Sequence, residues 1–131
     1  MIFVDSNVPM YLVGAEHPNK VRVSELLAQF IRENERLVTD VEVYQEVLHR
    51  YVSIRRHDAI DPAIASLDGI ADEVLPVNIA DIRAARQLIA SVDGISARDA
   101  LHAAVMRNAG IDRIFSLDGG FDAVPGVVRL A

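Results

Sequence analysis

The chain has 131 residues, carries a formal net charge of -6 at pH 7 and contains no cysteine, which excludes disulfides, thiolate catalysis and cysteine-ligated zinc. Charged residues interrupt each apolar run before it reaches the roughly 20 residues of a membrane span, and no basic segment precedes the first apolar run. We therefore expect one domain over residues 1–131, without a membrane anchor or secretory signal, in the cytoplasm.

Short apolar runs alternate with amphipathic segments along the chain. We expect strands at residues 2–4, 37–38, 73–77, 113–116 and 127–130. We expect a turn or short helix around residues 7–13 and helices at residues 21–35, 41–56, 62–72, 79–91 and 97–108, with Pro18 in a loop over 14–19 and a second loop at Gly119-Gly120. Because strands alternate with helices, the pattern favours an α/β fold with a mostly parallel sheet covered on both faces.

Apolar residues recur at the spacing of one helix face in three of these segments. The faces comprise Val23, Leu26, Leu27, Phe30 and Ile31; Val43, Tyr44, Val47, Leu48, Tyr51 and Val52; and Ile82, Ala85, Leu88 and Ile89. The segment 97–108 is apolar almost all round, so we expect it to lie deep between other elements.

Four carboxylates, Asp5, Glu46, Asp99 and Asp118, are spread along the chain. Asp5 closes the first expected strand and Asp118 follows the fourth, and the ends of parallel strands meet at the sheet edge where ligands bind. At about 5 Å and an effective dielectric near 20, each like-charged pair costs on the order of 3 kcal/mol, a cost that a cation removes. Hard divalent cations prefer carboxylate oxygens. The pattern therefore favours a metal-dependent, phosphate-cleaving site.

Each acid also has a local explanation. Asp5 fits the N-cap of the next helix, and Glu46 fits an ion pair with Arg50 one turn later. Asp99 stands three residues after a serine in a capping-box pattern, and Asp118 suits the turn that its two glycines form. The joint metal site is the interpretation that accounts for all four acids at once.

Three further residues leave alternatives open. Glu42 lies one turn before Glu46 and competes with it, while Asp122 lies four residues after Asp118 and either joins the site or faces water. His102 lies one turn after Asp99; a partly buried histidine with satisfied hydrogen bonds is favoured over a proton-transfer or phosphate-binding role.

Four short motifs, in this order, together resemble the PIN-domain nucleases, most closely the VapC-type toxins of toxin–antitoxin pairs. They are Ile2-Phe3-Val4-Asp5-Ser6-Asn7; Val38-Thr39-Asp40-Val41 with Tyr44-Gln45-Glu46-Val47-Leu48; Ser96-Ala97-Arg98-Asp99-Ala100-Leu101-His102-Ala103; and Ile114-Phe115-Ser116-Leu117-Asp118-Gly119-Gly120-Phe121. The resemblance spans the whole chain, and Ser116 stands where threonine is common.

The resemblance implies a three-layer PIN-like fold and an endoribonuclease. By this resemblance Asp5, Asp99 and Asp118 are expected to bind metal, and Glu46 is expected to be the fourth catalytic acid. The resemblance also makes Asn7 and Ser116 supporting polar groups. The implied cofactor is one or two Mg²⁺ or Mn²⁺ ions, and the implied partners are an RNA substrate, a cognate antitoxin and a second copy of the chain.

Two other functions remain as alternatives. Asp118 and Asp122 match the late Asp-x-x-x-Asp of haloacid-dehalogenase-like phosphatases, but Asn7 replaces a usual aspartate and Lys20 comes too early to be the late lysine. A non-catalytic interaction module built on the same fold is the other alternative, and the presence of all four acids speaks against it.

Overall fold

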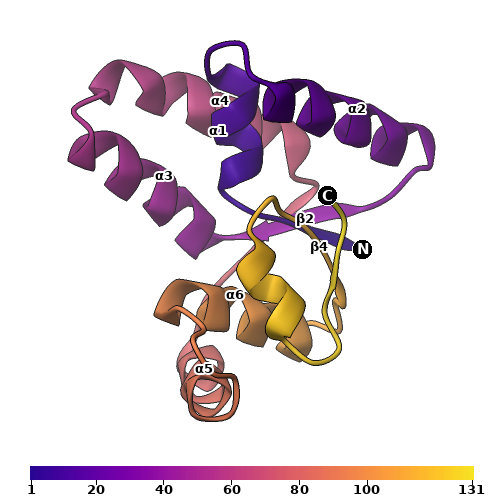
Figure 1. Ribbon diagram of the computed structural model, residues 1–131, viewed down its shortest axis with the longest axis vertical. Coiled ribbons are helices and arrows are strands. Elements are labelled where there is room, and N and C mark those ends of the chain that lie inside the picture. Colours follow the sequence, from indigo (N-terminus) through magenta and orange to yellow (C-terminus); the bar gives the residue numbers. More distant parts are fainter.

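The computed structural model describes all 131 residues, with a five-stranded sheet between two layers of helices (Figure 1). The strands are β1 (Ile2–Val4), β2 (Leu37–Asp40), β3 (Glu73–Leu75), β4 (Arg113–Phe115) and β5 (Val128–Arg129). They pair in the order β3-β2-β1-β4-β5, and every pair is parallel. The central strand β1 is an unbroken buried apolar run, as expected for a strand covered on both faces. The predicted α/β fold is confirmed.

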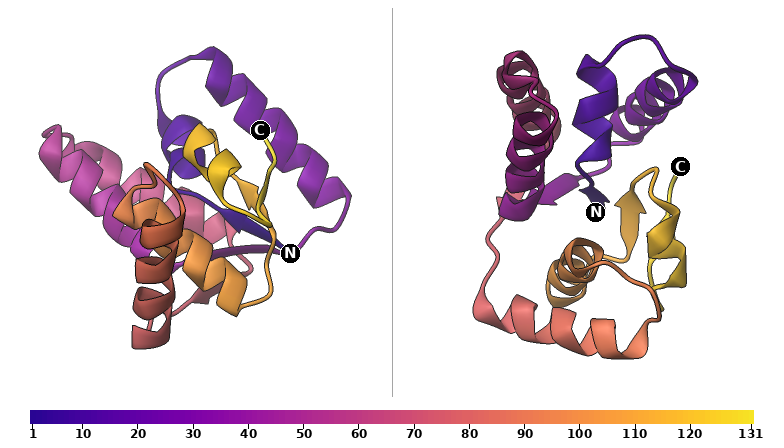
Figure 2. Two further views of the ribbon diagram at one scale, coloured as in Figure 1. Left: turned by 60° about the horizontal axis from the view of Figure 1, so that its bottom comes forward. Right: turned by 60° about the vertical axis from the view of Figure 1, so that its left-hand side comes forward.

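Six α-helices and two 3₁₀ helices connect the strands. They are α1 (Asn7–Val13), α2 (Pro18–Arg32), α3 (Val41–Ser53), η1 (His57–Ala59), α4 (Ile60–Ile70), α5 (Ile79–Ser91), α6 (Ala97–Asn108) and η2 (Gly119–Ala123). Helices α1 to α4 lie on one side of the sheet, and α5, α6 and η2 lie on the other (Figures 1 and 2). Crossovers between parallel strands are right-handed. Helices that connect strands added in one direction along the sheet therefore cover one face, and helices that connect strands added in the opposite direction cover the other face.

That reversal occurs between β1 and β4. The chain first adds strands from β1 towards β3 and later adds β4 and β5 on the opposite side of β1. The connections that leave β1 and β4 therefore depart to opposite faces and open a crevice at the carboxyl ends of these strands, where α/β proteins bind ligands. Asp5 directly follows β1, and its N–H donates to the carbonyl of Phe115 at the end of β4 (3.1 Å).

The sheet and its covering helices share the main hydrophobic core. The core contains 15 buried residues and includes the edge-on contact between Phe30 of α2 and Phe115 of β4, whose ring centroids are 5.1 Å apart. A second cluster of 7 buried residues joins α5 to α6 and contains Ala100, Ala103 and Ala104. These small side chains let α6 pack closely on its neighbours, and the predicted burial of this helix is confirmed. No helix combines the length and the apolar content that crossing a membrane requires.

Several element boundaries differ from the prediction. Helix α2 begins at Pro18 rather than at residue 21, because His17 Nδ1 accepts a hydrogen bond from the N–H of Asn19 (3.0 Å) and a proline fits the first turn. Helix α3 ends at Ser53 rather than at residue 56, since Arg55 adopts a left-handed backbone with φ of 57°. The loop expected at Gly119-Gly120 instead opens the short helix η2.

The predicted apolar helix faces were too wide. Five of their members are exposed: Ile31, Leu48, Val52, Ile82 and Ile89. Helix α5 packs mainly on α6 and lies away from the sheet (Figure 1). The part of its surface that contacts α6 is therefore narrower than the row of apolar residues along the helix. The spacing of apolar residues identified the helices, but it did not show how much of each stripe another element covers.

Candidate active site

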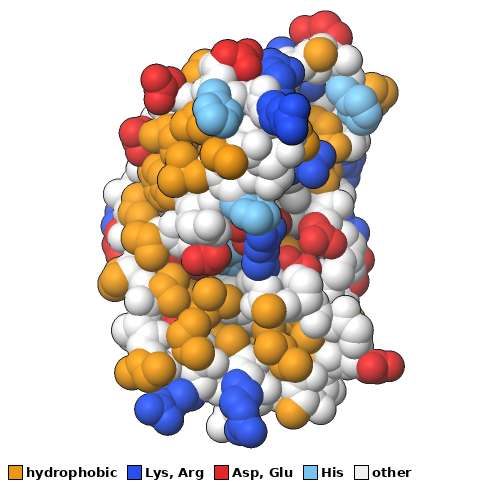
Figure 3. Space-filling view, turned by 90° about the vertical axis from the view of Figure 1, so that its left-hand side faces the viewer, with side chains coloured by type: hydrophobic (Ala, Val, Ile, Leu, Met, Phe, Trp, Pro, Cys, Tyr) orange, Lys and Arg blue, Asp and Glu red, His pale blue; other side chains and the backbone are white.

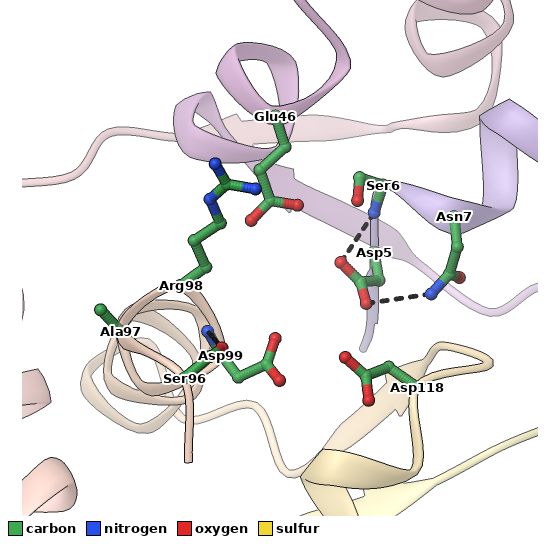
Figure 4. A pocket seen from close by; sticks show the side chains of 9 residues that line it. All are labelled: Asp5, Ser6, Asn7, Glu46, Ser96, Ala97, Arg98, Asp99 and Asp118. Atoms are coloured by element: carbon green, nitrogen blue, oxygen red, sulfur yellow. Dashed lines mark hydrogen bonds between the residues drawn. The ribbon is translucent and has the colours of Figure 1, made fainter. Parts of the chain in front are cut away.

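The four predicted acids come together around one pocket of about 490 Å³ at the crevice between β1 and β4. Its nine lining residues include a single hydrophobic one; they are Asp5, Ser6, Asn7, Glu46, Ser96, Ala97, Arg98, Asp99 and Asp118 (Figure 4). On the face that carries α3 and α5, the surface is hollowed across its middle, and charged side chains gather at the hollow (Figure 3). Segments far apart in the sequence thus form one strongly acidic cavity.

Asp5 is buried and held by three hydrogen bonds. Its Oδ1 accepts from the N–H of Ser6 (2.7 Å), while Oδ2 accepts from Ser116 Oγ (2.6 Å) and from Asn7 Nδ2 (3.3 Å). Burial raises the pKa of Asp5, although the charge of His102 and the Ser116 hydrogen bond oppose that shift. The expected N-cap role is not formed, because Ser6 is the N-cap residue of α1.

Asn7 and Ser116 tie the end of β1 to the end of β4. Asn7 Nδ2 donates to Ser116 Oγ (3.2 Å), and Asn7 Oδ1 accepts from the N–H of Leu117 (3.3 Å). Ser116 Oγ also accepts from the N–H of Asp118 (3.0 Å). These contacts fix the orientation of the Asp5 carboxylate and the backbone that carries Asp118.

Asp99 lies in the first turn of α6 with its carboxylate in the pocket (Figure 4). Half of the expected capping box is present, since Ser96 Oγ accepts from the N–H of Asp99 (3.1 Å) while the Asp99 carboxylate does not return that bond. Burial and the nearby charges of Asp118 and Asp5 raise the pKa of Asp99 to about 7. The carboxylates of the pocket therefore repel one another, and the hydrogen bonds of the site do not remove this repulsion.

Asp118 is exposed at the start of η2, where it also makes the turn that its position predicted. Its Oδ1 accepts from the N–H of Gly120 (2.8 Å). A Cβ atom at Gly120 would lie 3.1 Å from both Asp118 Oδ1 and Asp99 Oδ2, which is tighter than an ordinary contact. Glycine at this position therefore lets the two acids approach each other across the loop.

Glu46, rather than Glu42, reaches the pocket. Its side chain is buried, and its Oε1 lies 2.7 Å from His102 Nε2, so the ion pair with Arg50 is not formed. Burial acts to raise the pKa of Glu46, but the hydrogen bond and charge of His102 outweigh it and the pKa is lowered. Glu42 is absent from the lining of this pocket.

His102 has satisfied hydrogen bonds, as expected, but it is fully buried rather than partly buried. Besides Glu46 it contacts Asp40, whose Oδ2 lies 2.9 Å from His102 Nδ1. Burial would lower the pKa of His102, but the hydrogen bonds to the two carboxylates outweigh burial and raise it well above its ordinary value. Sequence reasoning gave Asp40 no role. Its position was a usable signal, because Asp40 is the last residue of β2 and Asp5 likewise stands at the end of β1. Arg98, which extends beside Glu46 (Figure 4), also received no role.

The donor atoms of the pocket suit a hard divalent cation. Asp5 and Glu46 each place one potential ligand atom within 4.8 Å of the other, and of the buried His102 behind the pocket, while Asp99 and Asp118 add carboxylates from the opposite wall. Carboxylate oxygens are the ligands that Mg²⁺ and Mn²⁺ prefer. A cation would also stabilise the ionised form of Asp99, so the residues fit such an ion.

An acid-lined pocket at the switch point of a parallel sheet is characteristic of α/β proteins that bind a ligand at this edge, and the sequence comparison specifies the family. A family model described as PIN domain matches residues 2–127. The chain therefore belongs to the PIN domain family, whose nucleases generally depend on divalent metals. The resemblance that the four motifs indicated is confirmed.

Curated relatives cover the full chain. A VapC ribonuclease of Mycobacterium bovis and ribonuclease VapC13 of Mycobacterium tuberculosis are each 53% identical to it over 131 residues, 100% of both chains. Ribonuclease VapC23 of M. tuberculosis is 40% identical over 90% of this chain and 93% of its own length.

Solved structures share the fold. The crystal structure of M. tuberculosis VapC20, a sarcin-ricin loop cleaving toxin, matches with a TM-score of 0.73 at 23% identity and covers 95% of each chain. VapBC2 of Rickettsia felis bound to a promoter DNA fragment matches with a TM-score of 0.70 at 14% identity, over 99% of this chain and 98% of that one. These matches confirm the predicted three-layer PIN-like fold.

The family assignment decides against the phosphatase alternative, and the geometry agrees. Asp122, the second acid of the Asp-x-x-x-Asp pattern, does not line the pocket. It is exposed and pairs with Arg129 through two hydrogen bonds of 2.8 and 3.0 Å. Asp122 therefore braces the C-terminal strand instead of joining the acids.

Proposed function

We propose that this chain is a Mg²⁺- or Mn²⁺-dependent endoribonuclease, the toxin component of a toxin–antitoxin pair, acting as one nuclease domain over residues 1–131. One observation carries the proposal: four carboxylates from separate segments meet around one pocket at the switch point of the sheet. The full-length identity of 53% to VapC ribonucleases supports RNA as the substrate.

In this proposal Asp5, Asp99 and Asp118 hold one or two divalent ions, and Glu46 holds a metal-bound water or a second ion. A bound ion supplies charge stabilisation at the phosphate and lowers the pKa of a coordinated water. Asn7 and Ser116 keep the Asp5 oxygens directed at the pocket. Oδ1 of Asp5 accepts one hydrogen bond and retains acceptor capacity, whereas Oδ2 already accepts two.

Two arginines near the acids have no ion pair within the chain. The ion-paired arginines are Arg36, Arg56, Arg113 and Arg129. Arg98 lines the acid pocket, and Arg50 lies one turn beyond Glu46 on α3. A free guanidinium beside a metal site is suited to bidentate contact with a phosphate. We assign Arg98 to the scissile phosphate or its neighbour.

A second cavity of about 470 Å³ adjoins the acid pocket and shares Asn7 with it. Its lining includes Tyr11, His17, Arg50 and Tyr51, and the rings of Tyr11 and His17 lie 5.5 Å apart. Aromatic faces with an arginine bind unstacked bases and the adjoining phosphate of single-stranded RNA. We assign this cavity to a nucleotide that flanks the cleaved bond.

The proposal includes two protein partners, a cognate antitoxin and a second copy of the chain, and places the protein in the cytoplasm. Solved neighbours include toxin–antitoxin complexes. Exposed apolar side chains on α3 and α5 supply surface for such contacts, and hydrophobic patches lie above and below the hollow in Figure 3. The residues are Val41, Leu48 and Val52 on α3 and Ile79, Ile82 and Ile89 on α5. A homodimer with two-fold symmetry is the common oligomer.

The test is cleavage of labelled RNA by the purified protein with Mg²⁺, with Mn²⁺ or with EDTA. The proposal predicts internal cleavage with either metal, products with 3′-hydroxyl and 5′-phosphate ends, and no cleavage with EDTA. Cleavage that is equally fast in EDTA would contradict metal dependence. Phosphate release from small phosphoesters with RNA left intact would contradict the nuclease assignment.

A further inference from the structure

A fully buried imidazole connects the acid pocket to the interior of the protein. His102 of α6 has no exposed surface, and its ring lies 5.4 Å from the ring of Phe3 in β1. Its polar contacts are Asp40 Oδ2 at 2.9 Å from Nδ1 and Glu46 Oε1 at 2.7 Å from Nε2. One of these acids, Glu46, lines the pocket, and the other does not.

Both ring nitrogens of His102 are engaged by carboxylates. Nδ1 lies at hydrogen-bond distance from Asp40 and Nε2 at hydrogen-bond distance from Glu46. The ring lies close enough to Asp5 and Glu46 to suggest a ligand set, but His102 does not line the pocket. The contact with Nε2 occupies Oε1 of Glu46 and leaves its second oxygen for the pocket.

The Asp40 carboxylate is itself fixed on both oxygens. Its Oδ1 accepts from the N–H of Val43 at the start of α3 (2.9 Å), and its Oδ2 faces His102. Asp40 is completely buried. An unbroken series of contacts therefore runs from the first turn of α3 through Asp40 and His102 to the Glu46 carboxylate, which belongs to the same helix.

We propose that His102 is a positioning residue that, anchored by Asp40, holds Glu46 by one oxygen so that Glu46 presents only its other oxygen to the pocket. The catalytic consequence rests on the proposed nuclease function. Glutamate has several rotatable bonds, and the contact with His102 restrains the rotation of the carboxylate that binding a cation through both oxygens would require. Outer partners that orient a metal-site carboxylate typically change activity or metal affinity by about 10- to 100-fold when they are removed.

The activity test compares His102→Gln, Glu46→Gln and the double variant at saturating Mg²⁺. We expect His102→Gln to lower kcat by about 10- to 100-fold with KM changed by less than about 2-fold, because the substrate does not contact the buried ring. The kcat of the double variant should lie within about 3-fold of the kcat of the slower single variant. The losses should not multiply, because His102 and Glu46 act through the same contact. Wild-type kcat in a folded His102→Gln protein, or losses that multiply in the double variant, would overturn the proposal.

A second pair of variants separates positioning from general damage to the fold. Asp40→Asn retains the N-cap of α3, because asparagine caps as well as aspartate, but it weakens the anchor of the ring. It should lower kcat in the same direction as His102→Gln while circular dichroism stays unchanged. His49→Gln, on the exposed surface of α3, is the control and should leave kcat unchanged. Wild-type kcat in Asp40→Asn would contradict the role of the anchor.

Two measurements on Mn²⁺ binding do not depend on RNA cleavage. In the wild type, pulsed electron paramagnetic resonance of bound Mn²⁺ should show no ¹⁴N coupling from an imidazole, and a strong coupling would make His102 a ligand and overturn the proposal. His102→Gln should raise the Mn²⁺ dissociation constant by about 10-fold. An unchanged constant would also contradict the positioning role. If the wild type binds Mn²⁺ as predicted but cleaves no RNA, the proposed function fails while the positioning of Glu46 stands.

Discussion

Ser116 Oγ donates a 2.6 Å hydrogen bond to Asp5 Oδ2 across 111 positions of sequence. The contact joins the end of β1 to the residue that follows β4, the two strands between which the sheet changes direction. It holds Asp5 in a buried position where an unpartnered carboxylate would be costly. This short contact therefore contributes directly to the position of the first acid in the crevice.

Ser116→Ala should weaken both stability and catalysis. It removes the donor to Asp5 and the acceptor for the N–H of Asp118, and leaving such buried groups unpaired costs about 1–3 kcal/mol of unfolding free energy. We expect RNA cleavage to fall by roughly 10-fold as Asp5 loses its orientation. Urea unfolding and cleavage rates measure the two effects. Ser116→Thr retains the hydroxyl and should keep most activity; equal losses in both variants would show that the hydroxyl is not the cause.

The two glycines of η2 offer a matched pair. Gly120→Ala places a methyl group 3.1 Å from carboxylate oxygens of Asp99 and Asp118, whereas Gly119→Ala meets only Asp122 Oδ2 at 3.8 Å. Displacing reacting groups by about 1 Å costs up to roughly 100-fold in rate, so Gly120→Ala should slow cleavage by at least about 10-fold. Gly119→Ala should remain close to wild type. Similar rates for both variants would contradict the close approach of the two acids.

Asp99 should make the metal-free protein less stable as the pH rises. Its pKa in the folded protein is about 7 against an ordinary value of 3.8, so the folded state binds more protons than the unfolded state between these values. The contribution of Asp99 is therefore fully present below about pH 4 and is lost as the pH rises through 7. Urea unfolding in EDTA across pH 5 to 8 should show this decline, and Asp99→Asn should flatten it. A decline that persists unchanged in Asp99→Asn would assign it to another group.

Arg50→Ala should impair substrate binding more than chemistry. Its guanidinium lines the cavity assigned to a flanking nucleotide, and a hydrogen bond to a charged group is worth about 1.5–3 kcal/mol, or roughly 10- to 100-fold in kcat/KM. The loss should appear in KM for short RNA and leave Mn²⁺ binding intact. Arg22→Ala, on the exposed side of α2, is the control. An unchanged KM combined with impaired binding of a partner protein would assign the cavity to that protein instead.

Much of the fold could be predicted because the three inner strands β1, β2 and β4 are largely buried runs and the helices carry clear apolar spacing. Asp5 and Asp118 follow strands that the sequence marks, so their shared edge was predictable. Glu46 could not be distinguished from Glu42 with certainty, since the choice depends on His102, 56 positions away. Asp40 was missed for the same reason: its partner is 62 positions distant, and its local signal is that of an N-cap alone. Local pattern identifies elements, whereas the contacts that orient side chains depend on tertiary structure.

The most direct test of the account is single-turnover cleavage of labelled RNA by the wild type and by Asp5→Asn, each with saturating Mg²⁺. Asparagine has nearly the same size as aspartate, and its amide oxygen can keep the hydrogen bond from Ser6, whereas its amide nitrogen cannot accept from Ser116. Circular dichroism should therefore match that of the wild type, and the melting temperature reports the cost of the lost contact. We expect cleavage by the wild type and a loss of at least about 100-fold in Asp5→Asn, because this change removes a group that holds the catalytic metal. A folded Asp5→Asn protein that cleaves RNA at the wild-type rate would contradict this expectation.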